Sequence, residues 1–341
     1  MKEEIHDIAE VAQDLRRRPR DPVCPAPHGK SNICRGSDEV IAIGMSTPEK
    51  AYVYVDGKFY PEDEAKISVF DHGFMYGDGV FDTMVQYRGG LFKLDEHIDR
   101  LYMSAAAIKL NIPLSKQEMK KAVIETVKKN HTQDTYIKIY ISRGKGLPWL
   151  DPSLCKAPTI VIMVIVGETK KYFDMEAPKE GLKVFVPTIR KTPSICLDSR
   201  IKSLQYLNNI LARIEAKAAG ADDAILLDIN GFVAEGSGEN VFLVKDGVLY
   251  TPPTTNTLDG ITRRVLIDIA HRANIEVVVG NLTMYDLYMA DEVFFASTAG
   301  GAVPIGQVNG RRIGTEWPGP ITAKLRELYF KELAAKSTPV Y

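Results

Sequence analysis

The sequence lacks the long apolar runs and paired cysteines that mark membrane and secreted proteins. No run approaches the roughly 20 apolar residues that a membrane-spanning helix needs, and the N-terminal MKEEIHDIAEVAQDLRRRP has no apolar core of a signal peptide. The 341 residues include four cysteines, which are scattered without a close CxxC pair. Such cysteines are typical of free thiols in a reducing compartment. These absences predict a cytoplasmic protein with no membrane partner.

Charge of one sign and grouped metal ligands are also missing. Lys and Arg number 43 and Asp and Glu number 44, so the formal net charge is -1 and nothing favours nucleic acid as a partner. Cys24, His28 and Cys34 lie in one Pro-rich stretch, but a fourth ligand is not apparent, and we expect no metal site. The composition, 45% hydrophobic and 26% charged, is that of a soluble globular protein.

Turn and strand signals divide the chain into four parts. Residues 1–47 are charged and then Pro-rich, and we expect them to form an N-terminal extension. We predict a small α/β domain over 48–168, a polar interdomain connection at 169–181 and a large domain over 182–341. The strands come mostly in hairpins. The predicted fold class is therefore α/β (α+β) with mainly antiparallel and mixed sheets, not a doubly wound parallel sheet.

The spacing of apolar residues predicts helices between and after the strands. They are expected at Glu96–Leu110, Lys116–Asn130, Tyr206–Ala219, Thr262–Ala273 and Ile321–Ala335. The third of these has an apolar stripe, which we expect to face the core and which consists of Leu207, Ile210, Leu211 and Ile214. The segment APTIVIMVIVG is almost wholly apolar and predicts a strand in the interior of its sheet.

Four loops are polar or built of small residues where their neighbours are apolar: IKSLQY (201–206), AEGSGEN (234–240), LDGITR (258–263) and STAGG (297–301). Lys202 lies just before an apolar helix. If it is buried, desolvation lowers its pKa and frees the amine for Schiff-base formation; otherwise it is an ordinary surface lysine. Glu235 follows a strand and either pairs with a heterocycle nitrogen or caps a turn.

The other two loops suit an anion. In LDGITR a turn glycine precedes the backbone amides of Ile261 and Thr262 at a helix start, where phosphate binds well. STAGG exposes several amides with little side-chain bulk, and it forms either a second anion nest or an ordinary tight turn. A reactive lysine, a carboxylate and two phosphate-binding turns are together the parts of a pyridoxal 5'-phosphate (PLP) site.

In this order the motifs resemble those of fold-type IV (class IV) PLP-dependent aminotransferases, from about Ala51 to Leu333. They are DHGFMYGDGVF (71–81), EHIDRLYMSA (96–105), IKSLQYLNN (201–209), AEGSGENVF (234–242) and DGITR (259–263). The resemblance implies a catalytic Schiff base on Lys202, and cofactor contacts from Arg100, Tyr206, Glu235, Ile261, Thr262 and Thr298. It also implies two α/β domains with PLP between them, a homodimer or higher homo-oligomer, and a small-molecule amino donor with a keto acid acceptor.

Within this group the sequence looks most similar to prokaryotic branched-chain aminotransferases, through KSLQYLNN, EGSGEN and TPPTTNTLDGITR. Three positions that we expect on the substrate side differ from those enzymes. Asp82 occupies the position of a glutamate in those enzymes, and Lys138 replaces the arginine of their Tyr-x-Arg strand. This chain has STAGG where those enzymes have a GTAAE turn. The candidate substrate contacts are Phe81, Tyr136, Lys138, Ala299 and Gly300.

Other activities stay open at this point. The TAGG turn, the PGPIT segment and the C-terminal tail resemble (R)-amine transaminases, and EHIDRLY is shared with D-amino acid aminotransferases. The Arg-x-His pair that binds the substrate carboxylate in D-amino acid aminotransferases is missing, since GKGLPWLD follows YISRG. Aminodeoxychorismate lyase, and a PLP-binding protein without turnover, are the remaining alternatives.

Overall fold

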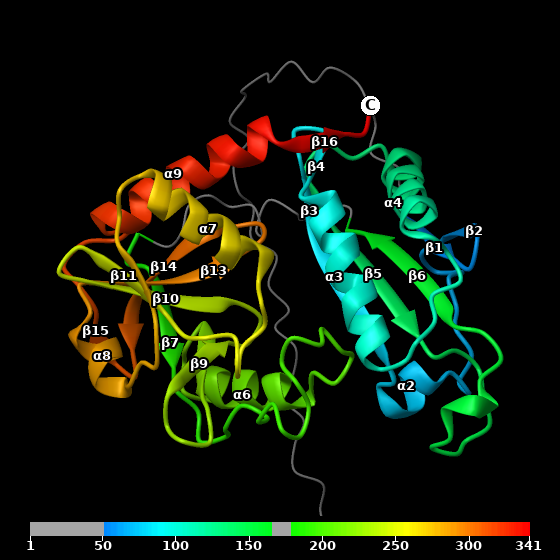
Figure 1. The fold of residues 1–341 in the computed structure, drawn as a ribbon, viewed down its shortest axis with the longest axis horizontal. Coiled ribbons are helices and arrows are strands. Elements are labelled where there is room, and N and C mark those ends of the chain that lie inside the picture. The colour runs from blue at the N-terminus through cyan, green and yellow to red at the C-terminus, as the bar shows by residue number, and fades with distance from the viewer. Residues whose placement is uncertain (1–50, 166–178) are drawn as a thin grey trace, which may run out of the picture. The chain divides into compact units, whose positions relative to one another are not determined.

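The computed structural model describes residues 51–165 and 179–341. The expected extension at 1–47, with Cys24, His28 and Cys34, and most of the expected connection at 169–181 lie outside the described residues. Figure 1 shows the described chain as two sheets, each with helices packed beside it. The sheets are antiparallel and mixed, as predicted, and the strands are joined both by hairpins and by helices.

The first sheet has seven antiparallel strands in the order β16-β4-β3-β5-β6-β1-β2. They are β1 (Tyr52–Val55), β2 (Lys58–Pro61), β3 (Gly79–Tyr87), β4 (Gly90–Phe92), β5 (Thr135–Ser142), β6 (Thr159–Val164) and β16 (Ser337–Pro339). The apolar segment that contains β6 lies inside the sheet, as predicted. Helices α3 (Leu94–Ala107) and α4 (Lys116–Asn130) bury Ile98, Leu101, Met119 and Val123 against it.

The second sheet has nine strands, in the order β12-β11-β10-β13-β14-β7-β8-β9 with β15 paired to β14. They are β7 (Leu182–Phe185), β8 (Asp223–Leu227), β9 (Val233–Gly236), β10 (Asn240–Lys245), β11 (Val248–Thr251), β12 (Val277–Val279), β13 (Glu292–Ser297), β14 (Gly301–Val308) and β15 (Arg311–Arg312). The pairs β11–β12, β14–β7 and β7–β8 are parallel and the others antiparallel.

Helices α7 (Ile261–Arg272) and α9 (Pro320–Ala335) cover this second sheet over Phe242 and Phe294, whose rings stack at a centroid distance of 5.1 Å. The same apolar cluster reaches the first sheet, because Phe92 on β4 packs edge-on against Tyr329 on α9 at 5.6 Å. The C-terminal strand β16 also pairs with β4. The C-terminal segment therefore joins the two sheets and holds them together.

The long helices lie close to their predicted bounds. Helix α4 has the predicted bounds, because the Ser115–Glu118 capping box fixes its start. Three short helices were not predicted: α2 (His72–Tyr76), η1 (Pro152–Leu154) and α8 (Met284–Met289). Each has too few residues to show an apolar period.

The third predicted helix, α6 (Leu207–Ala218), forms close to its predicted bounds, but the expectation that its apolar stripe faces the core is wrong. Its four large apolar residues are exposed, with relative accessibilities of 65% for Leu207, 52% for Ile210, 41% for Leu211 and 58% for Ile214. The helix instead packs on β8 through Ala212 and Ala216, against Ala224 and Leu226. Small side chains allow the helix to lie close to the strand, so the opposite, bulky face points to solvent.

Candidate active site

A cavity of about 380 Å³ collects residues from both sheets and from α3, α6 and α7. Its lining includes Phe81, Arg100, Tyr136, Lys138, Lys202, Tyr206, Glu235, Ile261, Thr262 and Thr298, all of them candidates from the sequence. It also includes Thr83, His97, Glu239 and Asn240, which the sequence analysis did not select. Ala299 and Gly300 are not among the lining residues. The methyl group of Ala299 is buried in the apolar core with residues of α7 and α9.

Lys202 is 8% exposed, so the alternative of a surface lysine is wrong. Its Nζ lies 4.5 Å from the ring centroid of Phe81 and 5.9 Å from that of Tyr206. Burial, with a contribution from the nearby Arg100 guanidinium, lowers the pKa of Lys202 to about 8. The cavity therefore contains an amine that is partly neutral near pH 7, which a nucleophile requires.

The backbone around Lys202 is held by the start of β3. The Phe81 N–H donates to the Lys202 carbonyl at 2.9 Å, and the Leu204 N–H donates to the Gly79 carbonyl at 3.0 Å. Gly79 allows this approach because a Cβ there would lie 2.5 Å from the Ile141 carbonyl oxygen. The glycine motif thus fixes the lysine loop on the strand that supplies Phe81.

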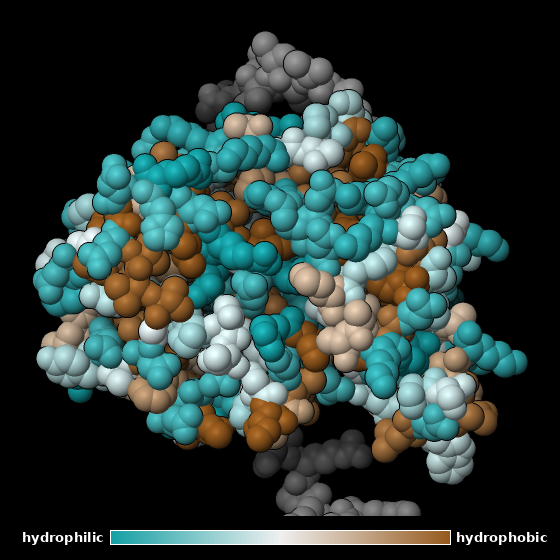
Figure 2. Space-filling model, in the orientation of Figure 1, coloured by the Kyte–Doolittle hydropathy of each residue, from teal (hydrophilic) through white to brown (hydrophobic). Residues whose placement is uncertain are grey.

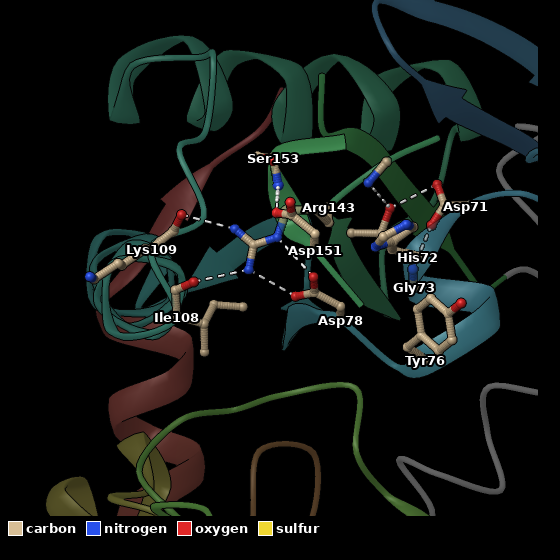
Figure 3. A network of polar contacts seen from close by, with 12 residues as sticks. Asp71, His72, Gly73, Tyr76, Asp78, Ile108, Lys109, Arg143, Asp151 and Ser153 are labelled. Atoms are coloured by element: carbon tan, nitrogen blue, oxygen red, sulfur yellow. Dashed lines mark hydrogen bonds and ion pairs between the residues drawn. The ribbon is translucent and has the colours of Figure 1, made fainter. Parts of the chain in front are cut away.

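The rest of that motif is structural (Figure 3). Asp71 caps α2 by accepting from the Gly73 N–H at 2.8 Å, and it also accepts from the Ser142 hydroxyl at 2.9 Å. Asp78 binds Arg143 through two hydrogen bonds of 2.9 Å, and Arg143 in turn donates to carbonyls at the end of α3. These contacts connect α2, α3 and β5 and so set the position at which β3 begins.

Arg100 is anchored by an aspartate on the far side of β3. Its Nε and Nη2 each donate to Asp82 at 2.8 Å, and His97 Nδ1 lies 2.7 Å from the same carboxylate. Burial alone would raise the pKa of Asp82, but Arg100 and His97 outweigh it and hold that pKa well below its usual range. Alternate residues of a strand point to opposite faces, so Phe81 and Thr83 line the cavity while Asp82 does not. The expectation that Asp82 lies on the substrate side is wrong.

The start of α7 lies at the same cavity as Arg100. Gly260 is its N-cap and no side chain caps the first turn, so the amides of Ile261 and Thr262 keep their capacity for an anion. A Cβ on Gly260 would lie 2.0 Å from Asn240 Oδ1, which explains the glycine. Thr298 follows β13, and its carbonyl accepts from the Tyr329 hydroxyl at 2.7 Å. A guanidinium and a helix N-terminus at one cavity form a site suited to phosphate.

Glu235 is buried and its two oxygens are both engaged. Oε1 pairs with Lys191 Nζ at 2.6 Å, and Oε2 accepts from the Leu258 N–H at 2.8 Å. The alternative of a turn-capping carboxylate is therefore wrong, because its partners lie on other segments. Lys191 was missed by sequence reasoning, since nothing in TIRKTP distinguishes it. Among the described residues, no group of three or more His, Cys, Asp or Glu side chains is arranged to hold a metal.

A family model described as amino-transferase class IV matches residues 79–308. The chain belongs to the class IV aminotransferases. A Methanocaldococcus jannaschii protein, named provisionally as a branched-chain-amino-acid aminotransferase, is 46% identical over 290 residues, which cover 83% of this chain and 96% of that protein. These matches make the chain an aminotransferase, and therefore a transferase enzyme.

Solved structures of similar fold agree with this class IV assignment. The branched-chain aminotransferase of the archaeon Thermoproteus uzoniensis, determined with norvaline, is 36% identical with a TM-score of 0.78, and the match covers 86% of this chain and 100% of that one. The T.th. branched-chain amino acid aminotransferase, in complex with N-(5'-phosphopyridoxyl)-L-glutamate, is 33% identical with a TM-score of 0.78, and the match covers 84% of this chain and 95% of that one. They confirm the predicted α/β fold class.

The class IV site has the groups that PLP requires. A buried amine, a carboxylate fixed by a cation and an amide, and a guanidinium beside a helix N-terminus all line one cavity.

None of the helices in the described part of the chain is both long enough and apolar enough to cross a membrane.

Proposed function

We propose that this aminotransferase binds PLP on Lys202 and transfers an amino group between a branched-chain amino acid and a 2-keto acid. The observation that carries the proposal is the position of Lys202, Glu235, Arg100 and the start of α7 around one cavity. The names of the similar enzymes support the branched-chain class. A monocarboxylic apolar substrate also suits the aromatic rings of Phe81 and Tyr206, which line the cavity and meet edge-on at a centroid distance of 5.0 Å.

When bound, PLP supplies an electron sink for the bond that breaks at the substrate α-carbon. The residues of this chain do the rest. Arg100, Thr298 and the amides of Ile261 and Thr262 would bind the phosphate, and Glu235 would accept a hydrogen bond from the ring nitrogen. Lys202 would hold the cofactor covalently through its amine, and as a free neutral amine it would act as the general base that moves the substrate α-proton. Phe81 and Tyr206 exclude water above the lysine.

Borohydride reduction followed by peptide mapping tests the cofactor assignment. We expect the label on Lys202, and a label on any other lysine would overturn the assignment. A half-reaction panel then tests the substrate class by following loss of the visible band of the bound cofactor with L-leucine, L-glutamate, D-alanine and (R)-1-phenylethylamine. A fast reaction with L-leucine supports the proposal. Reaction confined to D-alanine or the (R)-amine would overturn the branched-chain class.

We also propose that the chain works as a homodimer and that the two sheets are the cores of the domains 48–168 and 182–341, with β16 of the second domain added to the edge of the first sheet. Apolar side chains that no described residue covers support the dimer. They include Phe74 on α2, Trp149 and Leu150 after β5, and Leu207 and Ile214 on α6. Figure 2 shows hydrophobic surface at the lower edge of the view, where Figure 1 places α2 and α6. Sedimentation equilibrium would test this, and a monomer at micromolar concentration would contradict it.

A further inference from the structure

Lys191 contacts the carboxylate that faces the proposed cofactor ring, although it is not among the residues that line the main cavity. Its Nζ lies 2.6 Å from Glu235 Oε1, and the two side chains are 12% and 8% exposed. A smaller cavity on this side is lined by Lys191, Glu235 and Lys202 together. The ion pair is therefore almost completely shielded from water. In such a site of low dielectric constant, the charge of one partner strongly affects the other.

The position of Lys191 is fixed by its backbone neighbours. Its own N–H donates to the Leu227 carbonyl at 2.9 Å. Asn208 on α6 donates to the Arg190 carbonyl at 2.9 Å and accepts from the Thr192 N–H at 3.2 Å. The lysine is thus held on both sides and from two elements, unlike the surface ion pairs of long, free side chains.

The other oxygen of Glu235 is fixed in the same way. It accepts from the Leu258 N–H at 2.8 Å, and the Leu258 carbonyl accepts from Asn240 Nδ2 at 2.9 Å. A carboxylate has about four lone-pair positions. Two are used by Lys191 and Leu258, which leaves acceptor capacity for a ring N–H from the cavity.

We propose that Lys191 is a positioning residue that keeps the proton shared by Glu235 and the cofactor ring on the ring nitrogen. This inference rests on the proposed function, because the heterocycle is PLP. The Lys191 ammonium balances the charge of the buried carboxylate at 2.6 Å, so Glu235 can accept a hydrogen bond from a protonated ring. Without that cation a buried carboxylate is costly, and Glu235 takes the proton itself. The ring then loses its positive charge and with it much of its capacity to accept electrons.

The test compares PLP with its 1-deaza analogue, which has a carbon in place of the ring nitrogen and cannot be protonated there. The apo forms of wild type, Lys191→Met and Lys191→Arg are titrated with each compound, and the ratio of the two dissociation constants is the readout. Lys217→Met, which removes an exposed lysine from α6, is the matched control. If the substitution only disturbs the loop, the binding of both compounds weakens alike. Loss of the Lys191 charge weakens the binding of PLP alone.

We expect Lys191→Met to reduce the preference for PLP over the analogue by about tenfold, the factor that one pKa unit represents. The first half-reaction with L-leucine should slow by a similar factor. Lys191→Arg should retain the preference, because a guanidinium also pairs with a carboxylate. Equal weakening of both compounds, or no change in the ratio, would overturn the proposal. A wild type that forms no visible band with PLP and no borohydride label on Lys202 would instead overturn the proposed function itself.

Discussion

Asp82 and Arg100 form a bidentate, buried ion pair, in which Nε and Nη2 each donate to the carboxylate at 2.8 Å. The pair lies between β3 and α3 and directs the remaining guanidinium edge toward the cavity. Arg100, the proposed phosphate ligand, is thus anchored by this pair. Its position depends on Asp82, which does not line the cavity.

This pair predicts the effect of Asp82→Asn. The amide cannot accept from both guanidinium nitrogens and carries no charge, so Arg100 is left as a poorly paired buried cation. We expect the free energy of unfolding to fall by about 3 kcal/mol, the lower range for breaking a buried pair, and PLP affinity to fall as well. Thermal unfolding and titration of the apo enzyme with PLP measure the two effects.

Asp82→Glu is the control for this prediction. It keeps the charge and both acceptor oxygens, and glutamate is the residue that the branched-chain motif has at this place. It should retain most of the PLP affinity. If Asp82→Asn bound PLP as tightly as wild type, the ion pair would not position Arg100 for the phosphate.

The pKa of Lys202 predicts the pH dependence of cofactor capture. Burial, aided by Arg100, lowers this pKa to about 8, so the neutral amine gains population up to that pH and little beyond it. The rate of reductive methylation of apo Lys202 is measured by peptide mass spectrometry from pH 6 to pH 10. This rate should rise about tenfold per pH unit at first and level off near pH 8. N-acetyl-lysine amide is the control, because its rate should still rise at pH 10. A Lys202 profile that matched this control would show that the amine is not desolvated.

The chain order of the site could be predicted from the sequence, because the lysine, carboxylate and amide loops are local motifs. The contacts between them could not. Lys191 and Glu235 lie on different segments, and their pairing depends on how β7, β8 and β9 align. The face of α6 was predicted wrongly for a similar reason. A periodic pattern shows that a helix has an apolar side, but the packing of Ala212 and Ala216 on β8 decides which side is covered.

Lys138 is predicted to bind a substrate carboxylate. It lies on β5 opposite Thr83 of β3, both line the cavity, and no ion pair of the described residues involves it. Lys138→Met should raise the KM for 2-oxoglutarate by about tenfold, the loss of roughly 1.4 kcal/mol of charge pairing. Lys138→Arg should bind the diacid at least as well as wild type. If Lys138→Met leaves the affinity for every keto acid unchanged, the residue has only a structural role.

Gly260 is predicted to be essential to the phosphate end of the site. A Cβ at this position would lie 2.0 Å from Asn240 Oδ1, far inside contact distance. Asn240 would have to move, and its hydrogen bond to the Leu258 carbonyl would be lost, together with the placement of the Leu258 N–H on Glu235. We expect Gly260→Ala to lower the free energy of unfolding by about 1–3 kcal/mol and to weaken PLP binding, measured by thermal unfolding and by titration of the apo enzyme.

Gly280→Ala is the matched control, because a Cβ at Gly280 would meet no atom within 4 Å. Equal behaviour of the two variants would show that the approach of Gly260 to Asn240 does not matter for the site.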